Sequence, residues 1–303
     1  MDDIQDKNIQ EPEIPEFIIE HDDESQEEKY KRPPVSRWKR WLYRLSMLLG
    51  LVALVFLALF AYKKWAYYYH IGVPISTSPQ ENIDKLKQPT QEERAEVTLT
   101  HDSILGVALD LYAIHGLRAS IEFEEPDTTD HSVFLYCRSA DHTPDGKYLG
   151  SLVAEGKELQ NDRSRLGYMA MADGRMVIGI SRSEKVKDYV MERGGSFFRQ
   201  FILVSGGVIP PRFFLHGKVE RRAIGRMGNT LYYIATRHKE TLWDFADAIR
   251  EYGFIDAIYI TGGNNHHFYR TLDGTPHDIG NVEVDTLRKN TNIIPWLVFR
   301  RNP

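Results

Sequence analysis

The polar turn after the apolar segment 254–260 carries side chains well suited to binding a ligand. Thr261-Gly262-Gly263-Asn264-Asn265 combines two adjacent glycines with two amide side chains, and His266 and His267 follow directly. Glycine permits positive φ and lets a ligand approach the backbone closely, because no Cβ is present. Amide and imidazole groups add hydrogen-bond donors and acceptors. We therefore expect residues Thr261 to His266 to line a ligand-binding site.

A metal site is the first alternative for the adjacent histidines. Neighbouring side chains on an extended segment point to opposite faces, so His266 and His267 cannot easily bind one ion together. The sequence also has no P-loop, no G-x-S-x-G, no H-E-x-x-H and no C-x-x-C motif. We accordingly expect neither a metal nor another cofactor.

Three further groups follow or precede predicted strands. Asp141 and His142 come after the apolar segment 132–137 and are candidates for proton transfer. Arg222 precedes the apolar segment 231–235, where its guanidinium could bind an anionic oxygen with paired donors, although a surface basic pair is the alternative. The turn Ser205-Gly206-Gly207 ends another apolar segment and could line the same cleft.

Short strands dominate the pattern that must position these groups. Asp173-Gly174 and Ala154-Glu155-Gly156 each separate two short segments and predict hairpins. One helix is predicted from Thr241 to Tyr252, capped by Thr241 and ended by Gly253. The remaining strands are expected at 97–100, 119–123, 132–137, 197–204, 231–235, 254–260 and 294–299. The predicted class is α+β: a strand-dominated mixed sheet domain with few helices, preceded by one transmembrane helix.

The N-terminal third predicts a membrane anchor. Residues 1–28 are rich in Asp and Glu, which predicts a disordered tail. Residues 29–44 are basic, and Leu45 to Tyr62 is free of charge and spans roughly 27 Å as a helix, close to the thickness of a bilayer core. The apolar segment is too long, and the preceding segment too extended, for a typical cleaved signal peptide.

These features divide the chain into four parts. Residues 1–44 are predicted as a cytoplasmic tail, 45–62 as the transmembrane helix in the lipid bilayer, 63–95 as a stalk and 96–303 as the folded domain. The positive-inside rule places that domain outside the cytoplasm, in the periplasm if the cell is Gram-negative.

The net charge and the single cysteine limit which classes of function are expected. The net charge is −5 and no basic face with interleaved aromatic residues stands out in the C-terminal part, so no nucleic-acid partner is expected. The single cysteine, Cys137, lies in an apolar segment and is predicted to be a small buried hydrophobe.

Four motifs in order resemble the phosphodiester glycosidase domain family, over about 140 residues from His131 to Arg270. They are SVFLYCRSADHTPDGKYLGSLVAEGKEL, FILVSGGVI, RRAIG and LWDFADAIREYGFIDAIYITGG. The resemblance implies that Arg222 and the Gly262-Gly263 pair stand at family site positions. Where the family has an Asp before the two glycines, this chain has Thr261, and Gly207 replaces the family's Pro.

The resemblance implies two hypotheses. In the first, the domain hydrolyses a glycosyl phosphodiester of envelope glycans: Arg222 binds the phosphate, and Asp141 or His142 transfers protons. In the second, the domain keeps the fold without activity and binds a glycan or a protein, since threonine cannot ionise as the family's Asp does.

Overall fold

The computed structural model describes residues 36–69, 77–89, 93–139, 147–210, 213, 217–263, 266–280 and 294–301, with the backbone alone for 64–69. The chain divides into two compact units, Met1–Phe60 and Ala61–Pro303. Helix α1 (Arg37–Tyr69) contains a stretch, Arg37–Lys63, that is long and apolar enough to cross a membrane. The predicted segment 45–62 lies inside this helix. The predicted acidic tail, 1–28, lies outside the described residues.

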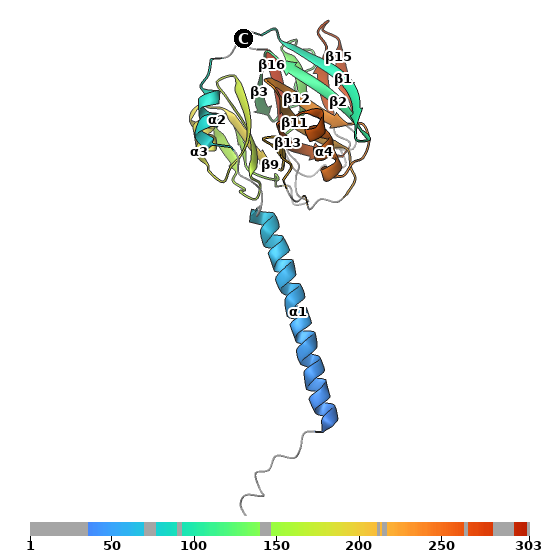
Figure 1. Cartoon of the computed structure of the whole chain (residues 1–303). Coiled ribbons are helices and arrows are strands. Elements are labelled where there is room, and N and C mark those ends of the chain that lie inside the picture. Colours follow the sequence, from blue (N-terminus) through green and yellow to red (C-terminus); the bar gives the residue numbers. More distant parts are fainter. Residues whose placement is uncertain are drawn as a thin grey trace, which may run out of the picture. The chain divides into compact units, whose positions relative to one another are not determined.

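Within the described residues, the strands of the second unit form antiparallel sheets (Figure 1). Sheet A has the order β1 (Glu96–Ile104), β2 (Val107–His115), β12 (Thr230–Thr236), β11 (Arg221–Met227), β13 (Asp256–Gly262), β10 (Ile202–Ser205). Sheet B has the order β15 (Pro276–Ile279), β14 (His267–Arg270), β4 (Val133–Arg138), β16 (Trp296–Arg301), β3 (Leu117–Glu122). Sheet C has the order β6 (Lys157–Gln160), β5 (Leu152–Ala154), β9 (Ser196–Gln200), β7 (Gly167–Ala172), β8 (Arg175–Ile180). The strand-dominated class predicted from the sequence is confirmed.

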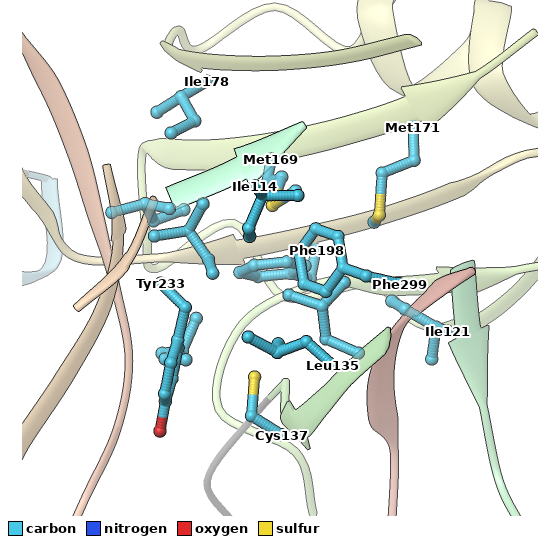
Figure 2. Close-up of a cluster of buried hydrophobic side chains, with 14 of the residues drawn as sticks. Ile114, Ile121, Leu135, Cys137, Met169, Met171, Ile178, Phe198, Tyr233 and Phe299 are labelled. Carbon is cyan, nitrogen blue, oxygen red and sulfur yellow. The ribbon is translucent and has the colours of Figure 1, made fainter. Parts of the chain in front are cut away.

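The main core lies where the three sheets meet. Its side chains include Tyr233 from sheet A, Leu135 and Phe299 from sheet B, and Met169 and Phe198 from sheet C (Figure 2). Each strand places alternate residues on opposite faces, so one face of every sheet contributes to this common core. Cys137 belongs to it as a buried free thiol, which confirms its predicted structural role.

The other face of sheet A is covered by helix α4 (Leu242–Tyr252), which packs through Leu242, Phe245 and Ile249. The Thr241 side chain accepts a hydrogen bond from the Asp244 N–H, and Gly253 ends the helix with φ 110°. Both predicted caps of this helix are therefore present.

Two short helices, α2 (Pro79–Leu86) and α3 (Lys185–Glu192), cover the other face of sheet C. Ile83 and Leu86 of α2 are buried there, and the Asn82 amide donates to the Tyr168 hydroxyl at 2.7 Å. Residues 77–89, which we expected in the stalk, therefore belong to the folded unit. The apolar face of α2 is the physical reason, because it can be buried only against another element. Stalk residues 70–76 and 90–92 lie outside the described residues.

Local turn chemistry predicts the hairpins correctly, but one predicted strand is divided. Asp173-Gly174 joins β7 to β8 with positive φ at both residues, the type I′ geometry. The expected strand 197–204 is split at Phe201 into β9 of sheet C and β10 of sheet A. The Gln200 side chain accepts the Phe201 N–H at 3.0 Å, so this amide is used at the point where the chain changes sheets.

Candidate functional site

Arg222 and Thr261 lie directly opposite each other at one end of sheet A. Strand β11 begins at Arg221, and β13 ends at Gly262, so the antiparallel pairing brings the start of one to the end of the other. Arg222 is the Cα partner of Thr261, and the backbone N–H of Gly263 donates to the Glu220 carbonyl at 2.9 Å. The structure thus brings together Arg222 and the glycine turn, two parts of the site that are 40 residues apart in the sequence.

A β-bulge in β13 places the Thr261 side chain on the same face of sheet A as the Arg222 side chain. Ala223 pairs with Tyr259, whereas Arg222 pairs with Thr261, so Ile260 is an extra residue on β13. Without it, strict alternation would leave Tyr259 and Thr261 on the same face. Because directly paired residues share a face, the bulge gives Thr261 the face of Arg222. Re-aiming of a side chain by a bulge is common beside binding sites.

The Arg222 guanidinium is buried and held by several acceptors. Its Nη1 donates to the carbonyls of Arg221 at 3.0 Å and Thr236 at 3.4 Å, and its Nη2 pairs with Glu220 at 3.0 Å. Burial opposes the charge, but the Tyr233 hydroxyl and Glu220 outweigh it and raise the pKa of Arg222 above its usual value. Arg222 is therefore a fixed cation, and its Nε is buried without an acceptor among the described residues.

Glu220 is a charged neighbour of Arg222 in the candidate site that the sequence reasoning missed. Its carboxylate lies 3.0 Å from Arg222 Nη2, and its side chain is 30% exposed, whereas Arg222 is 6% exposed. It stands two residues before Arg222 on an extended segment, so the two side chains share a face. That spacing was visible in the sequence, but Glu220 lies outside the RRAIG motif and before any recognised strand.

A layer of buried polar side chains supports Arg222 from the core side. The Tyr112 hydroxyl lies 3.0 Å from Nε2 of His267, and the Tyr233 ring centroid lies 5.1 Å from that of His267. Figure 2 shows Tyr233 and Cys137 on the side of the apolar cluster away from Met171. Burial raises the pKa of Tyr112, Tyr233 and Cys137, so these groups are neutral at pH 7. Of these groups, the Tyr233 hydroxyl accepts a hydrogen bond from Arg222, and the whole layer is too deeply buried to contact a ligand.

The two adjacent histidines face opposite sides of sheet B. His267 packs against Tyr112, while His266 packs against Tyr136 and Trp296. The Nδ1 of His266 lies 3.3 Å from Glu125, and its Nε2 contacts Asp278. The prediction that this pair would not chelate one ion agrees with the geometry. His266 itself is 2% exposed and anchors the end of the glycine turn between two carboxylates.

The turn Ser205-Gly206-Gly207 lies at the other end of β13. Ser205 pairs with Asp256, five residues before Thr261, so about 17 Å of strand separates it from Arg222. The N–H of Gly206 donates to the Asp256 carboxylate at 3.1 Å, and the N–H of Gly207 donates to the Ile255 carbonyl at 2.9 Å. The structure therefore does not bring this turn into the Arg222 site, and its amides are already used.

Gly262 is required by packing. An ideal Cβ added there would overlap the Tyr259 hydroxyl and would lie 3.0 Å from Val219 Cγ2. Gly263 differs, since no described residue lies within 4 Å of a Cβ added there, and its φ is +87°. The first glycine of the pair thus serves close packing, and the second serves the turn conformation.

We predict that Gly262→Ala lowers the free energy of unfolding by about 1–3 kcal/mol, the usual cost of overpacking. The Gly217→Ala variant is the control, because none of the residues that the structure describes lies within 4 Å of a Cβ added there. Urea unfolding followed by circular dichroism measures both. Adding Tyr259→Phe removes the overlapping hydroxyl and should recover part of the loss. Equal costs for Gly262→Ala and Gly217→Ala would contradict the packing explanation.

Four predicted site residues, Asp141, His142, Asn264 and Asn265, lie outside the described residues. Within the described part of the chain, no group of three or more His, Cys, Asp or Glu side chains could bind a metal ion. Two shallow cavities lined by described residues, about 630 and 360 Å³ in volume, contain none of the predicted site residues in their walls.

Comparison with known proteins gives distant likenesses. No protein-family model matches the chain, and a search of curated proteins finds no match. Among solved structures, the chain is similar to the zebrafish N-acetylglucosamine-1-phosphodiester alpha-N-acetylglucosaminidase catalytic domain, auto-inhibited by its pro-peptide. The TM-score is 0.48 at 13% identity, covering 71% of this chain and 87% of that one. It is also similar to a hypothetical protein from Synechocystis, with a TM-score of 0.49 at 10% identity, covering 68% of this chain and 62% of that one.

Proposed function

We propose that this chain is a membrane-anchored hydrolase of glycosyl phosphodiesters in envelope glycans. The observation that carries the proposal is the pairing of Arg222 with Glu220 at 3.0 Å, beside Thr261 and the two glycines. A cation that binds phosphate and a partly exposed carboxylate are the two groups that such a hydrolysis requires. Arg222 stands in RRAIG, one of the ordered motifs that resemble the phosphodiester glycosidase family, and Glu220 directly precedes that motif.

The chemistry divides between the two charged residues. Arg222 supplies the positive charge that attracts the phosphate, on the side where its Nη2 pairs with the partly exposed Glu220. Glu220 supplies the carboxylate that Thr261 cannot, and it transfers the proton to or from the glycosidic oxygen. Asp141 and His142 remain additional candidates for proton transfer, and Asn264 and Asn265 for binding the sugar. His266 is no longer a candidate, because it is 2% exposed and both of its ring nitrogens face carboxylates.

The test measures sugar released from a methyl diester of N-acetylglucosamine 1-phosphate by the full chain in detergent. We predict turnover by the wild-type protein and a loss of about 10²–10⁴-fold in Glu220→Gln, the usual contribution of a general acid or base. Glu251→Gln removes a comparably exposed carboxylate on α4 and should keep full turnover. Unfolding curves for both variants verify that the fold is intact. Equal turnover in the two variants would exclude Glu220 from the chemistry.

A non-catalytic glycan-binding module is the second candidate, and Thr261 favours it, because the family's acid is absent. In addition, the Arg222 guanidinium already donates hydrogen bonds to two backbone carbonyls, those of Arg221 and Thr236. The same diester decides between the candidates. Binding of the diester by calorimetry, with no sugar released by the wild-type chain, would overturn the hydrolase proposal and support the binding module.

The proposal includes membrane anchoring through Leu45 to Tyr62, with the N-terminus in the cytoplasm and the folded unit outside it. It is supported by the apolar stretch of α1, none of which is buried inside the molecule, and by the denser basic residues before it. Protease protection of the C-terminal unit in intact cells, with exposure after outer permeabilisation, tests this orientation.

A further inference from the structure

The first eight residues of helix α1 carry a stripe of arginines. Successive residues of an α-helix are turned by about 100°, so Arg37, Arg40 and Arg44 lie within an arc of about 60°. We call these three residues the arginine stripe. Lys39 lies about 100° or more round the helix from each of them. The basic residues of this segment are therefore divided between two faces, and three of the four share one.

An aromatic pair lies beside the stripe. Trp38 and Trp41 are one turn apart, their ring centroids are 5.5 Å apart, and both are more than half exposed. Tryptophan is enriched at the depth where hydrocarbon meets headgroups, because its ring is apolar and its N–H is polar. The pair therefore marks the depth of this segment once the helix is in a bilayer.

The rise of the helix places the arginine stripe at the depth of the lipid headgroups. Helix α1 is continuous through Leu45, where the charge-free segment begins. At 1.5 Å per residue, Arg44 lies about 2 Å and Arg37 about 12 Å beyond that point. Each headgroup layer of a bilayer is roughly 5–8 Å thick, so the stripe passes through it. Arg44 and Arg40 therefore lie at the depth of the lipid phosphates, about 2 and 8 Å beyond that point, and Arg37 lies on the aqueous side of them.

We propose that the arginine stripe binds the phosphate headgroups of anionic phospholipids in the leaflet at the N-terminal end of α1. Guanidinium suits this partner because its planar fork of donors matches two phosphate oxygens at once, whereas the lysine ammonium is a single point charge. Charge complementarity is greatest for lipids with net negative headgroups, since zwitterionic headgroups carry a compensating cation. The inference rests on the proposed membrane anchoring and on no part of the proposed hydrolysis.

The experiment uses the full chain reconstituted in vesicles of phosphatidylcholine and phosphatidylglycerol. Spin-labelled forms of each lipid report the fraction immobilised at the protein surface, and their ratio gives the selectivity. Wild-type protein should prefer phosphatidylglycerol, and Arg40→Gln should lower the selectivity by up to about fivefold at low salt, the effect of one basic residue near an anionic surface. Lys39→Gln removes the same charge at nearly the same depth from another face, and it should change the selectivity by less than twofold.

The possible results distinguish a failure of the arginine-stripe proposal from a failure of the membrane-anchoring proposal. Equal losses in Arg40→Gln and Lys39→Gln would overturn the stripe, because charge alone would then explain the selectivity. Wild-type protein that inserts in the vesicles without preferring phosphatidylglycerol would also overturn it, while leaving the anchor intact. Wild-type protein that is released from the vesicles by alkaline carbonate would overturn the anchoring proposal itself.

Discussion

Replacing Arg222 by alanine is expected to lower the free energy of unfolding by about 2–5 kcal/mol, because two buried carbonyls each lose a donor at roughly 1–3 kcal/mol. The variant leaves the Glu220 carboxylate without its cation and removes the donor that serves the carbonyls of Arg221 and Thr236. A buried carbonyl that loses its donor destabilises the fold, because water cannot reach it to supply another hydrogen bond. Urea unfolding of the detergent-solubilised chain measures the change.

Arg250→Ala is the matched control for this prediction. Arg250 pairs with Asp247 and Glu251 on α4, but its side chain is 39% exposed, so its loss should cost under about 1 kcal/mol. Arg222→Lys keeps the charge and loses the fork of donors, so the fold should survive while affinity for the phosphodiester falls at least about tenfold. A cost for Arg222→Ala as small as that for Arg250→Ala would contradict the buried position of the guanidinium.

Arg199→Ala is expected to have a comparable effect, a loss of about 3–5 kcal/mol, at a buried ion pair in sheet C. Arg199 is 1% exposed, and its guanidinium donates to the carbonyls of Ser181 at 2.7 Å and Ser183 at 3.1 Å and pairs with Glu184 at 3.0 Å. It thereby ties β9 to the segment that leads into α3. The exposed pair Arg193–Asp173 is the control, and Arg193→Ala should change stability only slightly. Similar losses in both variants would refute this role of Arg199.

The ion pair of Arg199 with Glu184 also predicts how the free energy of unfolding changes at acidic pH. Burial alone would raise the pKa of Glu184, but the hydrogen bond from Lys187 and the positive charge of Arg199 lower it below its usual value. A lowered folded-state pKa stabilises the fold above the unfolded pKa, near 4.5, and this contribution is lost as pH falls through the folded value. Glu184→Gln should therefore flatten the fall in unfolding free energy below about pH 5. An unchanged acid slope would exclude Glu184 as its source.

Local signals in the sequence determined the elements that depend on nearby residues alone. Thr241 and Gly253 fixed the ends of α4, because a cap needs only a hydroxyl oxygen at one end and positive φ at the other. Asp173-Gly174 fixed a hairpin for the same reason. The opposite orientation of His266 and His267 followed from the period of an extended chain.

The tertiary structure alone decided which of these elements meet. Ser205–Gly207 and Gly262–Gly263 looked equivalent as glycine turns at strand ends, yet they occupy opposite ends of β13, because the sheet is antiparallel and β10 pairs with its start. Glu220 joined the site through its contact with Arg222. The bulge at Ile260 set the face of Thr261. Strand order, register and bulges depend on contacts between segments far apart in the chain, and no local pattern records them.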